Sequence, residues 1–319
     1  MRWWRRLGAF AGVVILVGTL TAAYSEWLGD EAARAYPPIG AIVPIDGHAL
    51  HYREQRPAGP PLGTVVLIHG AWAGHADLFA TLAPHLSAYR VIAVDRPGQG
   101  WSERPAGSAL ASPARQAASL MTLLDRIAPE KFVVVAHSLA GALSTHLALT
   151  RPERLHGLVL LDALTHPFLG DPPAFVSLLT SDTFGPIINR VIALPLTRAM
   201  LGRGVELAFS PQSVPPHYVD ASELPLLFRE PAFRSNLQDL VAANAFLRQQ
   251  APRYRDLQLR VIAITGDTDA LVSPLRNAMR FVREAPQATL SALPGIGHMP
   301  HHAAPAVVIE AAMSLFPRP

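Results

Sequence analysis

Short runs of apolar, largely β-branched residues recur along the chain, and stretches with helical spacing separate them. The five clearest runs are TVVLI, RVIAV, FVVVA, LVLL and VIAIT, which begin at Thr64, Arg90, Phe132, Leu158 and Val261. Runs this short and this apolar are typical of strands buried on both faces of a parallel sheet. Helical spacing follows at 76–86, 113–127 and 139–150. The alternation predicts an α/β fold with a doubly wound, mostly parallel sheet.

Polar residues stand where these runs end. They are His69, Asp95, Ser138, Asp162 and the pair Asp267 and Asp269. The carboxyl ends of parallel strands meet at one edge of an open α/β sheet, and ligands bind in the crevice outside that edge. We therefore expect the chemistry of the protein there.

Residues 164–255 break the alternation, because no buried strand is apparent in them. A structureless loop of that length is implausible inside a compact domain. Helical spacing recurs near 187–201 and 236–250. We expect a helical cap over the sheet edge at about 164–255.

The amino terminus carries several arginines followed by 17 uncharged, mostly apolar residues from Leu7 to Ala23. As a helix this segment spans about 25 Å, the short end of what crosses a bilayer. Arginines before it and acidic residues after it place the amino terminus in the cytoplasm. We predict a single-pass anchor and linker at 1–36 and a catalytic domain at 37–319 in the periplasm of a bacterium. The alternative is secretion after signal cleavage near Ala23.

Charge and composition narrow the choice of partners. The chain has 27 basic and 24 acidic residues, so without Arg2, Arg5 and Arg6 the balance is 24 to 24. Nothing therefore indicates nucleic acid. The chain contains no cysteine, which excludes disulfides, thiolate nucleophiles and cysteine metal sites. His301 and His302 have a metal-like spacing, but no carboxylate lies near them in the sequence, and we predict neither metal nor cofactor.

Ser138 is the candidate nucleophile. It ends a strand and opens a helix, with Ala136 and Ala140 two residues to either side. A serine on such a sharp turn needs small residues at those positions and is exposed to a base. His298, in the loop LPGIGHMPHH, is the candidate base. The alternative is that Ser138 has no catalytic role and only caps the helix that follows it.

Two further parts complete an acyl-transfer site. The acid that orients the base is Asp267, Asp269 or Asp162, since each stands at a strand end. Backbone N–H groups must hold the oxygen on which negative charge develops. Leu139, directly after the serine, supplies one, and Ala71 or Trp72 in HGAWAG supplies the other.

The motifs HGAWAG, DRPGQGWS, AHSLAG, TGDTDALV and GIGHMPHH resemble the α/β-hydrolase fold superfamily, in its order and over nearly all of 42–316. The resemblance implies Ser138 as nucleophile and His298 as base. Its Gly-x-x-Asp pattern implies Asp269 as the acid, and it gives Asp95 a structural role. The chain departs from the family pattern in having alanine for both glycines around the serine. A serine rather than an aspartate nucleophile argues against dehalogenase and epoxide hydrolase chemistry.

We therefore predict a membrane-anchored serine hydrolase that acts on a small apolar ester, lactone or thioester through an acyl-enzyme. The same residues would also serve a carbon–carbon bond hydrolase, a hydroxynitrile-lyase-like enzyme or a cofactor-free perhydrolase. A silent binding module is the alternative from another class. The intact set of catalytic residues argues against it.

Overall fold

The computed structural model describes residues 2–107 and 109–317. Met1, Ser108 and the last two residues, which fall within the predicted ranges 1–36 and 37–319, lie outside the described part. The side chains of Arg2 and Arg5 lie outside it too.

An eight-stranded sheet in the order β1-β2-β4-β3-β5-β6-β7-β8 forms the centre of the molecule. β1 and β2 pair antiparallel and β2 joins β4 antiparallel, whereas the other strands run parallel. The strands are β1 Ala41–Ile45, β2 His48–Gln55, β3 Thr64–Ile68, β4 Arg90–Val94, β5 Phe132–His137, β6 Leu155–Leu161, β7 Val261–Gly266 and β8 Ala288–Leu293. The predicted α/β sheet is thereby confirmed, and all five apolar runs are strands of it.

Helices cover both faces of the sheet. The apolar side chains of α3, α4 and α10 pack with one face, and those of α2 and α12 pack with the other. These helices are α2 His75–Leu82, α3 Pro113–Ile127, α4 Ala140–Thr150, α10 Ala278–Glu284 and α12 Pro305–Ser314. The five strands that the apolar runs form, β3 to β7, are buried from both sides, which explains why their sequences are apolar without alternation.

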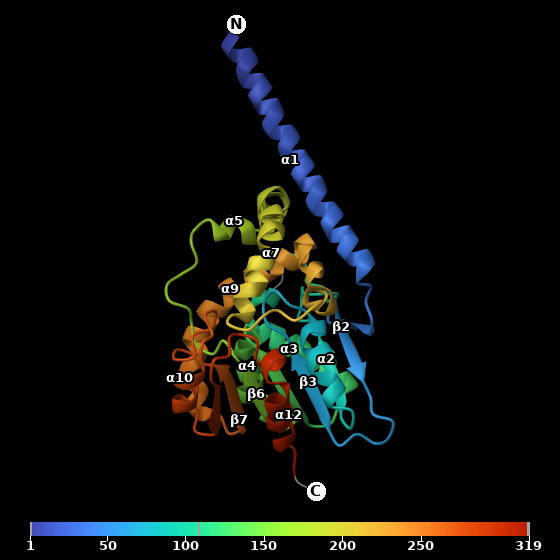
Figure 1. The fold of residues 1–319 in the computed structure, drawn as a ribbon, viewed down its shortest axis with the longest axis vertical. Helices are drawn as coiled ribbons and strands as arrows, with labels where there is room; N and C mark the ends of the chain where they lie inside the picture. The colour runs from blue at the N-terminus through green and yellow to red at the C-terminus, as the bar shows by residue number, and fades with distance from the viewer. Residues whose placement is uncertain (1, 108, 318–319) are drawn as a thin grey trace.

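The chain between β6 and β7, which we call the insertion, is helical and lies at one end of the sheet (Figure 1). Its elements are α5 Val176–Thr180, α6 Gly185–Ile188, the π-turn Asn189–Ala193, α7 Leu194–Phe209, α8 Tyr218–Ala221, the 3₁₀ turn Leu224–Phe228 and α9 Glu230–Gln250. It has a small apolar core of its own, which includes Leu194, Phe209, Phe228 and Phe233. The helical spacing near 187–201 and 236–250 thus marks parts of two longer helical stretches.

Helix α1, Arg2–Ala35, is much longer than the apolar segment expected from the sequence. Its amino-terminal half projects beyond the body, and its carboxyl-terminal half lies beside the insertion (Figure 1). Ser25 Oγ donates to the Arg190 carbonyl at 2.7 Å, and Tyr36 Oη, just after the helix, donates to Asp220 Oδ1 at 2.9 Å. The polar stretch that sequence analysis left as a connection is therefore a docked helix end.

Candidate active site

Ser138 occupies the sharp turn between β5 and α4. Its φ of 52° lies in the left-handed region, which is strained for a residue with a side chain. The turn is held by Ser138 N–H, which donates to the Leu161 carbonyl at 2.9 Å, and by the Ser138 carbonyl, which accepts from Leu164 N–H at 2.8 Å. The hydroxyl is thus fixed above the sheet, at the amino terminus of α4, where the helix dipole favours negative charge.

The turn is crowded on two sides, and glycines fill the crowded places. A Cβ at Gly70 would lie 2.7 Å from Ser138 Cβ, and one at Gly141 would lie 2.7 Å from Ala163 Cβ. Both distances are shorter than real Cβ contacts. Sequence reasoning identified the need for small residues at 136 and 140 and the close packing that Gly141 allows, but it did not identify the need for glycine at 70.

His298 links Ser138 to a carboxylate. Its Nε2 lies 3.0 Å from Ser138 Oγ, and its Nδ1 lies 2.7 Å from Asp269 Oδ2. Asp269 is itself held, because its Oδ1 accepts the N–H groups of Leu271 at 2.7 Å and Val272 at 3.0 Å. In this arrangement Nδ1–H is directed at the Asp269 carboxylate, and Nε2 is left to accept from the serine.

The other two candidate acids lie elsewhere. Asp267 is exposed, and its Oδ1 accepts Gly295 N–H at 2.7 Å instead of contacting His298. Asp162 is buried behind Asp269, where its Oδ1 accepts from Thr265 Oγ1 at 2.6 Å. Of the three acids, Asp269 is the one whose oxygen meets the His298 ring.

The backbone N–H groups of Ala71 and Leu139, which line the cavity beside Ser138, have no acceptor in the described part of the chain. Trp72, the alternative to Ala71, donates its N–H to Asn236 Oδ1 of α9 at 2.7 Å. The insertion therefore occupies the Trp72 donor and leaves Ala71 and Leu139 unpaired beside the serine.

A cavity of about 550 Å³ opens in front of Ser138 and His298. Helix α7 forms much of its wall, and Phe168, Leu240 and Leu271 contribute from other segments. Apolar side chains dominate the lining, and among the described residues that line it there is no lysine or arginine. The cavity therefore suits an uncharged, apolar group.

A second carboxylate borders this cavity. Asp77 of α2 lies 3.2 Å from His301 Nε2 and 2.8 Å from His302 Nε2. Despite burial, these two histidines hold the pKa of Asp77 well below its usual range. Burial and the Asp77 charge raise the pKa of Tyr218, which also borders the cavity. The sequence premise that His301 and His302 lack a carboxylate nearby was wrong, because Asp77 is remote only along the chain.

His137, the residue before the nucleophile, packs against the ring of His298 at a centroid distance of 4.8 Å. Its Nε2 donates to the His298 carbonyl at 2.9 Å, which fixes the backbone of the candidate base. Burial, together with the neighbouring His301, lowers the pKa of His137 well below its usual value, so this ring is neutral.

Asp95 ties loops together away from the serine. It lies 2.7 Å from His51 Nδ1 and 3.2 Å from His75 Nδ1, and it accepts the N–H groups of His75 and Trp101. These contacts fit the structural role that the resemblance implied.

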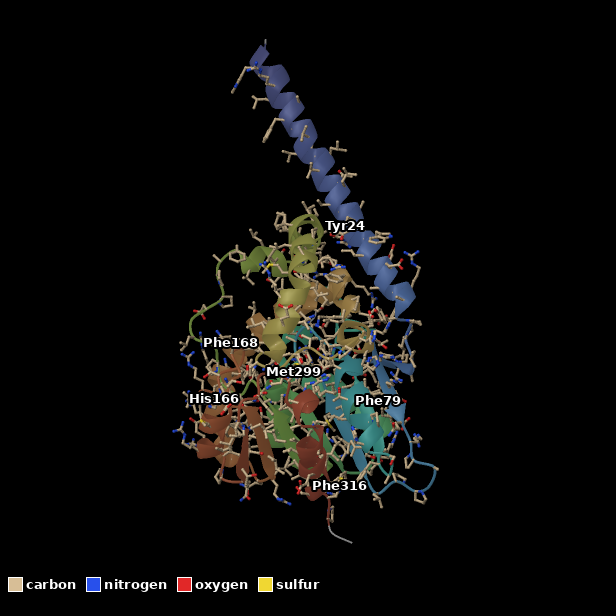
Figure 2. The ribbon with its side chains drawn as sticks, viewed as in Figure 1. Tyr24, Phe79, His166, Phe168, Met299 and Phe316 are labelled. Carbon is tan, nitrogen blue, oxygen red and sulfur yellow. The ribbon has the colours of Figure 1, made fainter. Side chains whose placement is uncertain are left out.

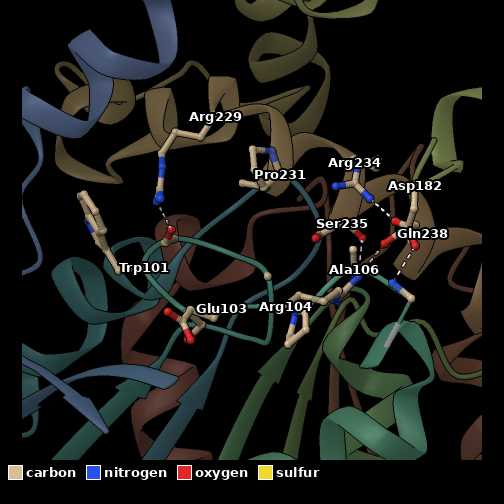
Figure 3. A pocket seen from close by; sticks show the side chains of 16 residues that line it. Trp101, Glu103, Arg104, Ala106, Asp182, Arg229, Pro231, Arg234, Ser235 and Gln238 are labelled. Carbon is tan, nitrogen blue, oxygen red and sulfur yellow. Dashed lines mark hydrogen bonds and ion pairs between the residues drawn. The ribbon is translucent and has the colours of Figure 1, made fainter. Parts of the chain in front are cut away.

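A polar cavity of about 410 Å³ lies between the loop after Asp95 and the insertion, and it contains none of the candidate catalytic residues (Figure 3). Arg229 Nη1 donates to the Gly100 carbonyl at 2.6 Å, and its guanidinium lies 4.4 Å from the centroid of the Trp101 ring. Arg104 Nη2 contacts Asp239 Oδ1 of α9 at 2.5 Å. These bonds hold the insertion over the sheet edge and so help to shape the apolar cavity.

The fold and this site define the class of the protein. The sequence profile of the alpha/beta hydrolase family matches residues 65–311, so the chain belongs to that family. The lipase LipV of Mycobacterium tuberculosis is 36% identical over 113 residues, which cover 35% of this chain and 41% of that protein. The chain spans less than half the length of each of the first three curated relatives it matches.

Two further similarities cover more of the chain. A 2-hydroxy-6-oxononadienedioate/2-hydroxy-6-oxononatrienedioate hydrolase of Dechloromonas aromatica is 26% identical over 258 residues, 78% of this chain and 84% of that protein. The crystal structure of a membrane phospholipase A, described as a bacterial virulence factor, superposes with a TM-score of 0.62. It is 19% identical and covers 98% of this chain and 96% of its own. At that identity the likeness concerns the fold.

Proposed function

We propose that the protein is a serine ester hydrolase in which Ser138 is the nucleophile, His298 the base and Asp269 the acid. The observation that carries the proposal is the chain of contacts from Ser138 Oγ to His298 Nε2 at 3.0 Å and from His298 Nδ1 to Asp269 Oδ2 at 2.7 Å. A serine hydroxyl becomes a useful nucleophile only when such a base takes its proton.

The reaction has two halves. Ser138 Oγ attacks the carbonyl carbon while His298 Nε2 takes its proton, and the N–H groups of Ala71 and Leu139 stabilise the oxyanion. His298 then gives that proton to the leaving alcohol, and the acyl group stays on Ser138. Water attacks the acyl-enzyme with the same base, and the acid is released. Asp269 keeps Nδ1–H oriented and stabilises the imidazolium. No step requires a cofactor.

The lining of the cavity supports an apolar acyl or alcohol group. The relative from Dechloromonas aromatica is named for a dioate, a substrate with two carboxylates. In this chain no described lysine or arginine lines the cavity, and the Asp77 carboxylate borders it. A dianion would be repelled there, so esters are favoured over that substrate class.

A direct test uses the full-length protein in detergent. Wild type, Ser138→Ala, Asp269→Asn and Asp267→Asn are labelled with a fluorophosphonate and assayed with p-nitrophenyl esters of increasing chain length. We expect Ser138→Ala to abolish labelling, and we expect turnover to fall about 10⁴–10⁶-fold in it. Asp267→Asn is the matched control and should stay within about threefold of wild type, as expected of a substitution away from the site. Folded wild type that neither labels nor hydrolyses any ester would overturn the proposal.

We also propose that α1 anchors the protein, that the domain at 37–319 lies in the periplasm, and that the insertion is its cap and rests on the membrane. One helix within the described residues, Arg6–Ala35, is long and apolar enough to cross a bilayer. A signal sequence would pass the same test. Cleavage would separate the apolar segment from a helix end that is bonded to the body through Ser25.

The depth of the insertion follows from its contact with α1. A Cβ at Gly18 would lie 3.9 Å from Val191 Cγ1, so the π-turn of the insertion is level with Gly18. Ala23, the end of the apolar segment, lies about 7 Å further along the helix. If the membrane surface lay on the amino-terminal side of Gly18, only the eleven residues from Leu7 to Val17 would remain inside the bilayer. They would span about 16 Å as a helix, which is too short to cross it. This length supports a bilayer that reaches the insertion.

The surface at that level is apolar. Phe184, Ile187 and Ile192 are 58%, 66% and 60% exposed. Leu196 and Met200, which follow them on α7, are exposed and also line the cavity. Figure 2 shows the amino-terminal half of α1 rising past this end of the molecule, with Tyr24 where the two meet. An amphiphilic ester in the outer leaflet would meet the cavity without crossing water.

Vesicle assays test this orientation. Phe184→Ser, Ile187→Ser and Ile192→Ser should each lower turnover of a long-chain ester embedded in vesicles several-fold. Turnover of a soluble short-chain ester should not change, because the variants leave the cavity intact. Leu62→Ser is the matched control, since Leu62 is 69% exposed and lies outside the insertion. Equal effects of Leu62→Ser and Ile187→Ser on vesicles would contradict the proposed orientation.

A further inference from the structure

Asp162 ends β6 in a strained conformation that β7 holds in place. Its φ of 40° lies in the left-handed region. Its N–H donates to the Ile264 carbonyl at 2.9 Å, and its Oδ1 accepts from Thr265 Oγ1 at 2.6 Å and from Gly266 N–H at 3.0 Å. The side chain has therefore no freedom to turn its other oxygen toward solvent.

That other oxygen, Oδ2, is buried, and none of the described residues donates a hydrogen bond to it. The carboxyl groups of Asp162 and Asp269 and the ring of His298 each supply one atom, and these atoms lie within 4.8 Å of one another. On Asp269 the donors Leu271, Val272 and His298 leave an acceptor position open.

Two buried carboxylates this close cannot both be ionised, so one of them keeps a proton. Burial and the Asp269 charge raise the pKa of Asp162 well above its usual value. The Asp269 carboxyl group, by contrast, accepts hydrogen bonds from three donors, as a carboxylate does. Among the described residues, the titratable groups that face Asp162 are Asp269 and His298.

We propose that Asp162 is a positioning residue, whose protonated Oδ2 donates a hydrogen bond to the Asp269 carboxylate. The acid of the site is then a pair of carboxyl groups that shares one proton and one negative charge. The bond fixes Asp269 against His298 and satisfies the otherwise unpaired Oδ2. If Asp269 is neutralised, Asp162 can ionise and orient His298 in its place.

The first test needs no substrate. Infrared difference spectra of the full-length protein at neutral pH should show the carbonyl band of a protonated carboxylic acid that disappears in Asp162→Asn and persists in Asp267→Asn. In Asp269→Asn the band should titrate at lower pH than in wild type, because the neighbouring charge is gone. This second variant decides the matter if Asp162→Asn does not fold. A band that is the same in all four proteins would overturn the proposal.

The second test is kinetic, and only this readout rests on the proposed ester hydrolase. Asp162→Asn keeps a donor toward Asp269, and its combination with Asp269→Asn gives a double variant in which neither residue can ionise. An asparagine at the acid position lowers kcat about 10⁴-fold where no second carboxyl replaces it. In Asp269→Asn we expect kcat to fall about 10²-fold and to rise with pH as Asp162 ionises. In the double variant we expect kcat to fall about 10⁴-fold and not to rise with pH. KM should stay unchanged. Equal kcat and equal pH profiles in Asp269→Asn and the double variant would show a merely structural Asp162.

Discussion

At the scale of single residues, two buried carboxylates besides the candidate acid are each held by two histidine rings. Asp95 contacts His51 and His75, and Asp77 contacts His301 and His302. Removal of one partner from such a group leaves the other buried and unpaired, which is expensive. The Asp77 group matters most for function, because it borders the cavity beside His298.

The depressed pKa of Asp77 predicts acid sensitivity. Its folded value lies well below the ordinary 3.8, so the ionised group contributes stability that is present above that value. This contribution is lost as pH falls through the folded pKa. Asp77→Asn should therefore lower the free energy of unfolding by about 1–3 kcal/mol at neutral pH and by less in acid. Thermal unfolding from neutral pH to about pH 3 measures the difference.

The control for this prediction is Asp46→Asn, since the Asp46 side chain is 72% exposed. Its unfolding curve should run parallel to that of wild type. If the Asp77→Asn curve also runs parallel, the histidine pair does not stabilise the carboxylate.

Sequence alone could identify the residues that we propose as catalytic but not those that hold them in place. Ser138 and His298 stand in local patterns, and Asp269 is distinguished from Asp267 by a family spacing. Asp77 and Gly70 act through contacts with partners distant in the chain, and no local pattern marks such contacts. Asp162 was predicted only as one of three candidate acids, because the positioning role that we propose for it depends on the side-by-side pairing of β6 and β7.

At the scale of elements, the turn from β5 to α4 depends on how closely α4 approaches the segment after β6. A Cβ at Gly141 would lie 2.7 Å from Ala163 Cβ and 2.9 Å from the Leu164 carbonyl. Gly141→Ala should therefore destabilise the fold by about 1–3 kcal/mol through overpacking. It should also lower activity, because Leu164 N–H holds the Ser138 carbonyl. Chemical unfolding and ester turnover measure the two effects.

The matched substitution is Gly202→Ala on α7, where an added Cβ meets no atom within 4 Å. That variant should be neutral or more stable by up to about 1 kcal/mol, since alanine favours a helix. Equal loss of stability in both variants would contradict the crowding argument, because an added Cβ at Gly202 meets no atom within 4 Å.

Elements differ in how well the sequence predicts them. Strand runs and the helix Pro113–Ile127 were predicted closely, since each has a local pattern and clear ends. The extent of α1 was missed, because its last turns are polar and are helical through their contacts with the insertion, such as Ser25 with Arg190. The insertion was recognised by the lack of strands, but the register of its helices depends on packing over the sheet.

At the scale of the whole molecule, α1 and the insertion form one structural unit. The Arg190 carbonyl of the insertion accepts a hydrogen bond from Ser25 Oγ, and the Arg190 guanidinium forms an ion pair with Glu26 at 2.5 Å. Ala32 of α1 is buried. Trp101, from the loop after β4, donates its Nε1–H to the Tyr36 carbonyl at 3.0 Å. Helix α1 is therefore joined to the insertion and to the loop after β4 as well as to the chain that follows it.

Two truncations separate anchoring from support of the cavity. Residues 24–319 lose the apolar segment but keep Ser25, Leu28 and Ala32, so this chain should match wild type in melting temperature and in turnover of a soluble ester. Residues 37–319 also lose the docked helix end and expose the apolar surface under Leu28. We expect this shorter chain to melt about 5–10 °C lower and to turn over soluble esters more slowly. Both truncations should lose activity on vesicle-embedded esters. Equal melting temperatures of the two truncations would show that α1 serves only as a tether.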